Sequence, residues 1–170
     1  MTMALAEYNF GTLRHGWDDL RSAAFVAGLD LVNGLADASD GFVWRAREAD
    51  PGHDGARPAD LLPQDRGRMD AAGHAATLSV GQSVQALEHF VWNTVHRQFY
   101  SRKAEWYDAF GNSNMVLWWI EPGTRPTEAE GMARWRHAQT HGDTDHAFGW
   151  TYLKEAQLWK TKACNEMAAE

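Results

Sequence analysis

One segment of the chain gathers the residue types that proton-transfer chemistry needs. Residues 88–100 read EHFVWNTVHRQFY. Positions three, four and seven apart share one face of a helix, and the residues that share such a face here are His89, Trp92, Asn93, His96 and Tyr100. Imidazoles suit an acid or base role near neutral pH, and an amide can orient a developing oxyanion. The pattern therefore predicts a candidate site with an aromatic wall.

A second interpretation of the same segment stays open. The apolar stripe of this helix is displaced from the polar face and consists of Val84, Leu87, Val91 and Val95. A polar face outside the core stripe commonly faces solvent or a partner subunit. Only a cleft on that side would make the face a functional site.

Histidines and acids also gather near residue 140, and the cluster consists of His137, His141, Asp143, Asp145 and His146. Two histidines one helical turn apart can chelate a metal, but no His-Glu-x-x-His pattern is present. Histidine near a helix C-terminus is favoured by the helix dipole, so we expect a capping role and no metal. Cys164 is the single cysteine, which excludes an internal disulfide and a cysteine-based zinc site.

Hydrophobic periodicity predicts the elements that must position these residues. We expect strands at 3–10, 41–47, 75–80, 115–120 and 148–153, and helices at about 18–38, 84–109 and 127–142. Ser83 and the Thr127–Glu130 capping box mark two helix starts. The order predicts an α+β fold with an open sheet and helices on one face. The segment 49–73, rich in Pro, Gly and Asp, is expected to be a mobile loop.

The strand at 115–120 is apolar on both of its faces, since Val116, Trp118 and Ile120 alternate with Leu117 and Trp119. A sheet with one wet face alternates apolar and polar residues. We therefore expect a homodimer in which sheets pack against each other.

Composition and charge exclude several classes of protein. The net charge is −7 over 170 residues and no basic stripe is present, so a nucleic-acid partner is not expected. No apolar run approaches the ~18–20 residues of a membrane span, and no signal peptide or nucleotide-binding motif is visible. A cytoplasmic protein is the resulting expectation.

Several segments resemble a known family: LAEYNFG at 5–11, GFVWR at 41–45, FVWNTVHR at 90–97, EWY at 105–107 and VLWWI at 116–120. They resemble a bacterial domain family of unknown function, related to antibiotic biosynthesis monooxygenases in the dimeric α+β barrel superfamily. The resemblance implies a ferredoxin-like antiparallel sheet with helices on one face, dimerising through the sheet. It covers residues 3–153, and we expect a domain at 1–155 followed by a tail at 156–170.

The resemblance also implies a pocket between sheet and helices, and a monooxygenase-like small-molecule enzyme without a metal or cofactor. It would act by His-assisted acid/base chemistry or by cofactor-free oxidation on a hydrophobic, aromatic or polyketide-like substrate. The expected catalytic residues are His96, Asn93, His89 and Tyr100, and the expected substrate-binding residues are Trp92, Trp106, Trp118, Phe99 and Trp44. Two alternatives remain: a haem enzyme of the same superfamily, with His96 or His89 as ligand, and a non-catalytic ligand-binding or interaction module.

Overall fold

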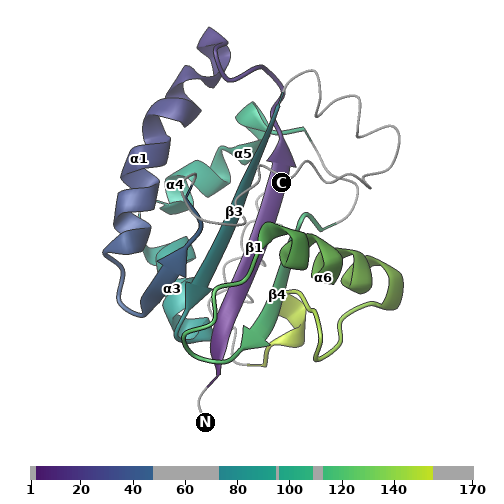
Figure 1. The fold of residues 1–170 in the computed structure, drawn as a ribbon. Helices are drawn as coiled ribbons and strands as arrows, with labels where there is room; N and C mark the ends of the chain where they lie inside the picture. Colours follow the sequence, from purple (N-terminus) through teal and green to yellow (C-terminus); the bar gives the residue numbers. More distant parts are fainter. Residues whose placement is uncertain (1–2, 48–72, 95, 109–112, 155–170) are drawn as a thin grey trace.

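A computed structural model describes residues 3–47, 73–94, 96–108 and 113–154 of the chain (Figure 1). The strands are β1 (Ala4–Thr12), β2 (Phe42–Arg45), β3 (His74–Gly81) and β4 (Met115–Ile120). The α-helices are α1 (Ala23–Asp37), α3 (Val84–Asn93), α4 (His96–Ser101), α5 (Lys103–Trp106) and α6 (Glu128–His141), and two short 3₁₀ helices are η1 (Leu20–Ser22) and η2 (Trp150–Tyr152). The expected loop at 49–73, save its last residue, and the expected tail at 156–170 lie outside the described residues.

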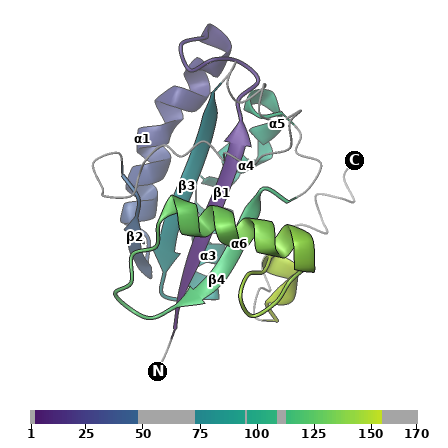
Figure 2. The ribbon, with the colours of Figure 1, turned by 45° about the vertical axis from the view of Figure 1, so that its right-hand side comes forward.

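The four strands form one antiparallel sheet in the order β2-β3-β1-β4. Glu7 lies opposite Ser79 on β3 and opposite Leu117 on β4, and the pairing of β2 with β3 shifts register between Phe42 and Trp44. Two crossover helices, α1 and α3, connect the strands on one face (Figure 2). This is the α+β arrangement that the sequence predicts, in the ferredoxin-like form that the family resemblance implies.

Both faces of the sheet are covered within the chain. Successive side chains of a strand point to opposite faces. Leu5 packs with Val84 of α3, whereas Tyr8 packs in a separate cluster with Met132 and Trp135 of α6. Figure 2 shows α6 crossing the sheet on the side away from α1 and α3. Helix α6 is therefore an addition to the one-sided ferredoxin-like arrangement.

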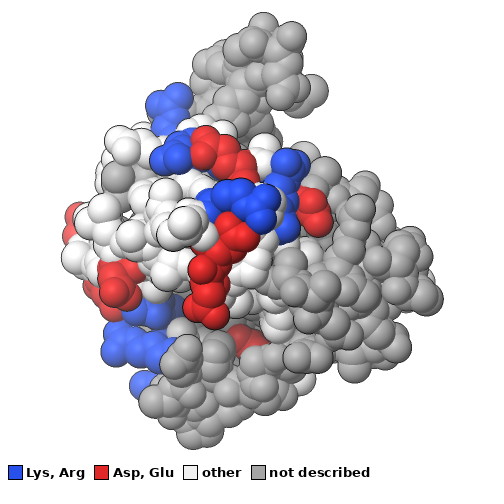
Figure 3. All heavy atoms as spheres, turned by 90° about the horizontal axis from the view of Figure 1, so that it is seen from above, with Lys and Arg blue, Asp and Glu red and all other residues white. Residues whose placement is uncertain are grey.

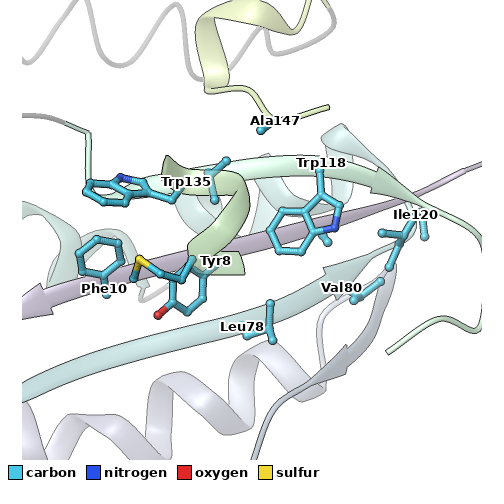
Figure 4. Close-up of a cluster of buried hydrophobic side chains, with 12 residues drawn as sticks. Tyr8, Phe10, Leu78, Val80, Trp118, Ile120, Trp135 and Ala147 are labelled. Carbon is cyan, nitrogen blue, oxygen red and sulfur yellow. The ribbon is translucent and has the colours of Figure 1, made fainter. Parts of the chain in front are cut away.

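This position of α6 removes one argument for a dimer. Trp118 of β4 is fully buried in the cluster beneath α6 (Figure 4), and Leu117 is fully buried on the opposite face. The apolar residues on both faces of β4 thus have partners in the same chain. The homodimer stays a prediction, which now rests on the family resemblance alone.

The helix expected over 84–109 is interrupted after Asn93. Thr94 has an extended backbone, with φ −115° and ψ −178°. Its hydroxyl donates a hydrogen bond to the carbonyl of Phe90 (2.6 Å) and accepts one from the amide of His96 (3.2 Å). A threonine side chain can replace backbone hydrogen bonds in this way, so Thr94 closes α3 and starts α4.

The expected helix starts are confirmed at two positions. Ser83 accepts from the amide of Ala86, and Thr127 accepts from the amide of Glu130. Glu130 does not complete the capping box by reaching back, because its carboxylate accepts a hydrogen bond from Arg134 at 2.9 Å. The strand expected at 148–153 is wrong: Phe148 makes one isolated bridge with Leu117, and η2 follows.

Candidate functional site

The face of the sheet beneath α1 and α3 has a polar centre between two apolar clusters. One cluster surrounds Leu5 and Val84, and the other contains Leu13, Phe25 and Trp106. Glu7 lies on β1 between Leu5 and Leu13 and shares their face, because it is separated from both by an even number of residues. An interruption of the core by polar groups is typical of a ligand site.

Glu7 is almost fully buried, with 7% of its surface exposed. Its carboxylate accepts hydrogen bonds from the Ser79 hydroxyl (3.1 Å) and from the Asn9 side-chain amide. Burial raises the pKa of Glu7 to about 7, although both hydrogen bonds act in the opposite direction. A carboxyl group with such a pKa can accept and return a proton at neutral pH.

Helix α3 brings a second buried carboxyl group to the same level of the sheet. Its buried residues are Val84, Glu88 and Trp92, which form one stripe spaced by four residues. Val84 packs with Leu5, and four residues of helix and two residues of strand both advance about 6–7 Å. Glu88 therefore lies level with Glu7, and only 2% of Glu88 is exposed.

The histidine face expected from the sequence divides into two parts. His89 and Asn93 are exposed, and their side chains lie 3.3 Å apart, between Asn93 Nδ2 and His89 Nδ1. The break at Thr94 separates them from His96 and Tyr100, which lie on α4.

His96 is half-buried among aromatic residues. Its ring centroid lies 4.8 Å from that of Phe90 and 6.4 Å from that of Tyr100. Tyr100 in turn meets the buried Trp92 edge to face at 5.4 Å. Burial lowers the pKa of His96, and the contact of Nδ1 with the carbonyl of Val91 (3.4 Å) opposes this shift. His96 is therefore neutral at pH 7.

The five expected substrate-binding residues occupy three separate places. Trp92 lies on α3. Phe99 and Trp106 pack together at a centroid distance of 5.8 Å, in the cluster at the Leu13 end of the sheet. Trp44 and Trp118 belong to the cluster on the opposite face, beneath α6. The sheet separates these last two side chains from Glu7.

Sequence reasoning missed Glu7, although a signal for it was present. In β1 the alternation of Ala6, Tyr8 and Phe10 with Glu7 and Asn9 resembles a strand with one wet face. The same analysis expected both faces of the sheet to be covered, and a polar residue in a strand covered on both sides must be buried. Buried carboxyl groups with shifted pKa values are candidates for function.

Charge does not single out a further site. Figure 3 shows Lys and Arg side chains interspersed with Asp and Glu on one face of the molecule. Some of these charges form ion pairs, as in Arg21–Asp19 (2.7 Å) and Arg102–Glu105 (2.8 Å). Within the described ranges, no group of three or more His, Cys, Asp or Glu residues is arranged to hold a metal ion.

The comparisons with known proteins identify a family and no activity. Neither a curated protein nor a solved structure is significantly similar to this chain. In the part of the chain that the structure describes, no helix has the length and apolarity needed to cross a membrane. One family model matches residues 4–164. The chain therefore belongs to the family described as Domain of unknown function (DUF3291).

Proposed function

We propose that the protein is a small-molecule enzyme that transfers protons through Glu7 on a hydrophobic, aromatic or polyketide-like substrate. The observation that supports this proposal is a buried carboxyl group with a pKa of about 7 between two apolar clusters. The location, between the sheet and the helices, is where the family resemblance implies a pocket. The base is then Glu7, and not His96 as expected from the sequence.

Glu7, Ser79 and Asn9 have different roles in the proposed reaction. The carboxylate form of Glu7 abstracts a proton from the substrate, and the acid form returns it at another atom or to water. Ser79 and Asn9 each donate one hydrogen bond to the carboxylate, so they fix its orientation and favour its charged form. The two hydrophobic clusters on this face of the sheet provide the apolar contacts that a hydrophobic substrate needs.

Exchange of carbon-bound protons with deuterium tests this function without knowledge of the product. Aromatic ketones and phenols of the polyketide type are incubated with the protein in D₂O, and loss of proton signal is followed by NMR. We expect exchange with the wild-type protein and at least about a hundredfold slower exchange with Glu7→Gln, the size of a typical acid–base contribution.

Glu105→Gln is the matched control, since Glu105 is an exposed carboxyl group on α5. It should exchange like the wild type. Unchanged exchange in Glu7→Gln would show that Glu7 is not the base. Binding of these compounds with no exchange would assign the chain to the alternative class, a non-catalytic ligand-binding module.

Haem binding is a second candidate function, and one observation favours it. The Nδ1 atom of His96 faces the carbonyl of Val91, and a metal-ligating histidine commonly donates its other ring N–H to a carbonyl. The lowered pKa of His96 keeps the imidazole neutral, as an axial ligand must be. His96 would then hold the iron, which supplies redox chemistry when bound.

Titration with hemin distinguishes the two candidates. A sharp Soret band that His96→Ala abolishes and His89→Ala retains would support haem. If titration with hemin produces no protein-dependent band, haem binding is refuted. The result of the deuterium-exchange experiment is unaffected by this outcome.

A further inference from the structure

We propose that three histidines, two at the end of α6 and one in the segment that follows, form an acid-sensitive latch, which holds residues 142–153 against the edge strand β4. This inference is independent of the proposed function, because the latch lies outside the Glu7 site. It rests on the contacts of the latch segment, on the geometry of the three imidazoles and on the charges around them.

The latch segment (residues 142–153) covers the edge of β4 and contributes to both cores. The amide of Phe148 donates to the carbonyl of Leu117 (2.9 Å), and the amide of Leu117 donates back (2.7 Å). Phe148 is fully buried on the α3 side and Ala147 is fully buried on the α6 side. Figure 2 shows this yellow segment beside β4, below the end of α6. Loosening it would expose a strand edge and part of the cluster that contains Leu5.

Three imidazole rings meet where α6 joins the latch segment. The ring centroid of His137 lies 4.5 Å from that of His141 and 4.7 Å from that of His146. His137 Nε2 also lies 3.2 Å from the hydroxyl of Thr144. The cluster therefore sits on the connection between helix and segment, and His137 contacts the segment directly.

A fixed positive charge stands beside these rings. Arg134 donates a hydrogen bond to the carbonyl of His146, and its Nη1 atom lies 3.4 Å from Nδ1 of the same residue. Arg134 also pairs with Glu130 at 2.9 Å, which offsets part of its charge. The guanidinium group of Arg134 still disfavours protonation of the neighbouring His137.

Two nearby carboxylates, which keep their negative charge, are hydrogen-bonded to groups of the latch segment. Asp143 accepts from the amide of Gly149 (2.9 Å), and Asp145 accepts from the hydroxyl of Tyr152. The carbonyl groups at the end of α6 attract positive charge. This attraction is shared at one helix terminus, whereas a charged His137 would also repel His141 and His146, whose rings contact its own.

The pKa of His137 indicates the direction of the effect. Desolvation, followed by His141, His146 and Arg134, lowers this pKa below its ordinary value of 6.5. A histidine with a lowered pKa binds fewer protons in the closed latch than in the open one. The closed state is therefore stable above about pH 6.5 and is progressively lost as the pH falls below that value.

Hydrogen–deuterium exchange at single amides measures this opening. Protection of the Phe148, Leu117 and Ala147 amides is compared at pH 7.5 and pH 5.5 after correction for intrinsic exchange rates. We expect protection to fall several-fold at the lower pH, with about tenfold as the upper limit for one histidine of ordinary pKa 6.5, while the amides of β1 and β3 keep theirs. Equal corrected protection at both pH values would overturn the proposal.

A double variant, His137→Gln with His141→Gln, tests whether the imidazoles carry the effect. Glutamine is neutral and keeps an amide that can reach the hydroxyl of Thr144, so the pH dependence should disappear. His15→Gln, outside the cluster, should keep it. Persistence of the pH dependence in the double variant would overturn the proposal.

A measurement on the wild-type protein covers the case in which the double variant does not fold. The imidazole resonances are titrated by NMR. His137 should titrate below the ordinary value of 6.5, and titration of His137 at or above that value would refute the latch.

Discussion

Replacement of Glu7 by glutamine should stabilise the protein at high pH. Folding raises the pKa of this carboxyl group from 4.5 to about 7, so the native state binds more protons than the unfolded state between these values. The stability of the wild type therefore decreases as the pH rises through this range. Glutamine has the same shape, cannot ionise and can still accept and donate hydrogen bonds at this position.

The magnitude follows from the two pKa values. One pKa unit corresponds to about 1.36 kcal/mol, so the complete ionisation of Glu7 costs about 3.4 kcal/mol of the free energy of unfolding. About 0.8 kcal/mol of this is already lost at pH 5, which leaves about 2.5 kcal/mol between pH 5 and pH 9. Glu7→Gln should gain that amount relative to the wild type across this interval.

Urea denaturation of both proteins at pH 5, 7 and 9 measures the difference, in which the other ionisations cancel. Glu105→Gln is the control, because hydrogen bonds with Arg102 lower the pKa of Glu105 below 4.5, so its difference from the wild type should hardly change between pH 5 and pH 9. A difference between Glu7→Gln and the wild type that does not change with pH would refute the raised pKa. It would also remove the main support for Glu7 as the base.

Two further predictions concern the packing of α6 and the break in the helix after Asn93. A Cβ atom on Gly131 would lie 2.7 Å from the ring of Tyr8, whereas one on Gly34 would meet nothing within 4 Å. Gly131→Ala should therefore lower the free energy of unfolding by about 1–3 kcal/mol, and Gly34→Ala should raise it by up to about 1 kcal/mol. Equal effects of the two substitutions in urea denaturation would contradict the packing of α6. Thr94→Ala should lower the free energy of unfolding by about 1 kcal/mol, because the cap of α4 disappears. Thr94→Ser keeps the hydroxyl and should be close to the wild type in stability. A serine variant as unstable as the alanine variant would show that the hydroxyl does not matter.

Local elements could be predicted from the sequence where their signals are local. The starts of α3 and α6 are examples, since Ser83 and Thr127 bond to amides three residues further along. The break at Thr94 could not be predicted in this way. The hydrophobic periodicity of residues 84–109 continues through Thr94. The break is favoured by the two hydrogen bonds of the Thr94 hydroxyl, which are seen only in the folded chain.

The candidate site was predictable in its region but not in its residues. Two imidazoles on a helix were a plausible base, and the sequence placed His89 and His96 on a common face. The fold turns His89 to solvent and half-buries His96. It encloses Glu7 beneath two helices, where desolvation and not residue type sets the proton affinity.

The sequence by itself determined the order of the four strands along the chain, the caps of α3 and α6 and the α+β class, because alternation and capping depend on neighbours within a few residues. The ferredoxin-like form was implied by the family resemblance. Only the tertiary structure decided that α6 covers the second face of the sheet, that Thr94 divides a helix and that Glu7 is buried between apolar clusters. These features depend on contacts between residues far apart in the chain. A free-energy difference of a few kcal/mol, such as the cost of ionising Glu7, arises only when those contacts exclude water.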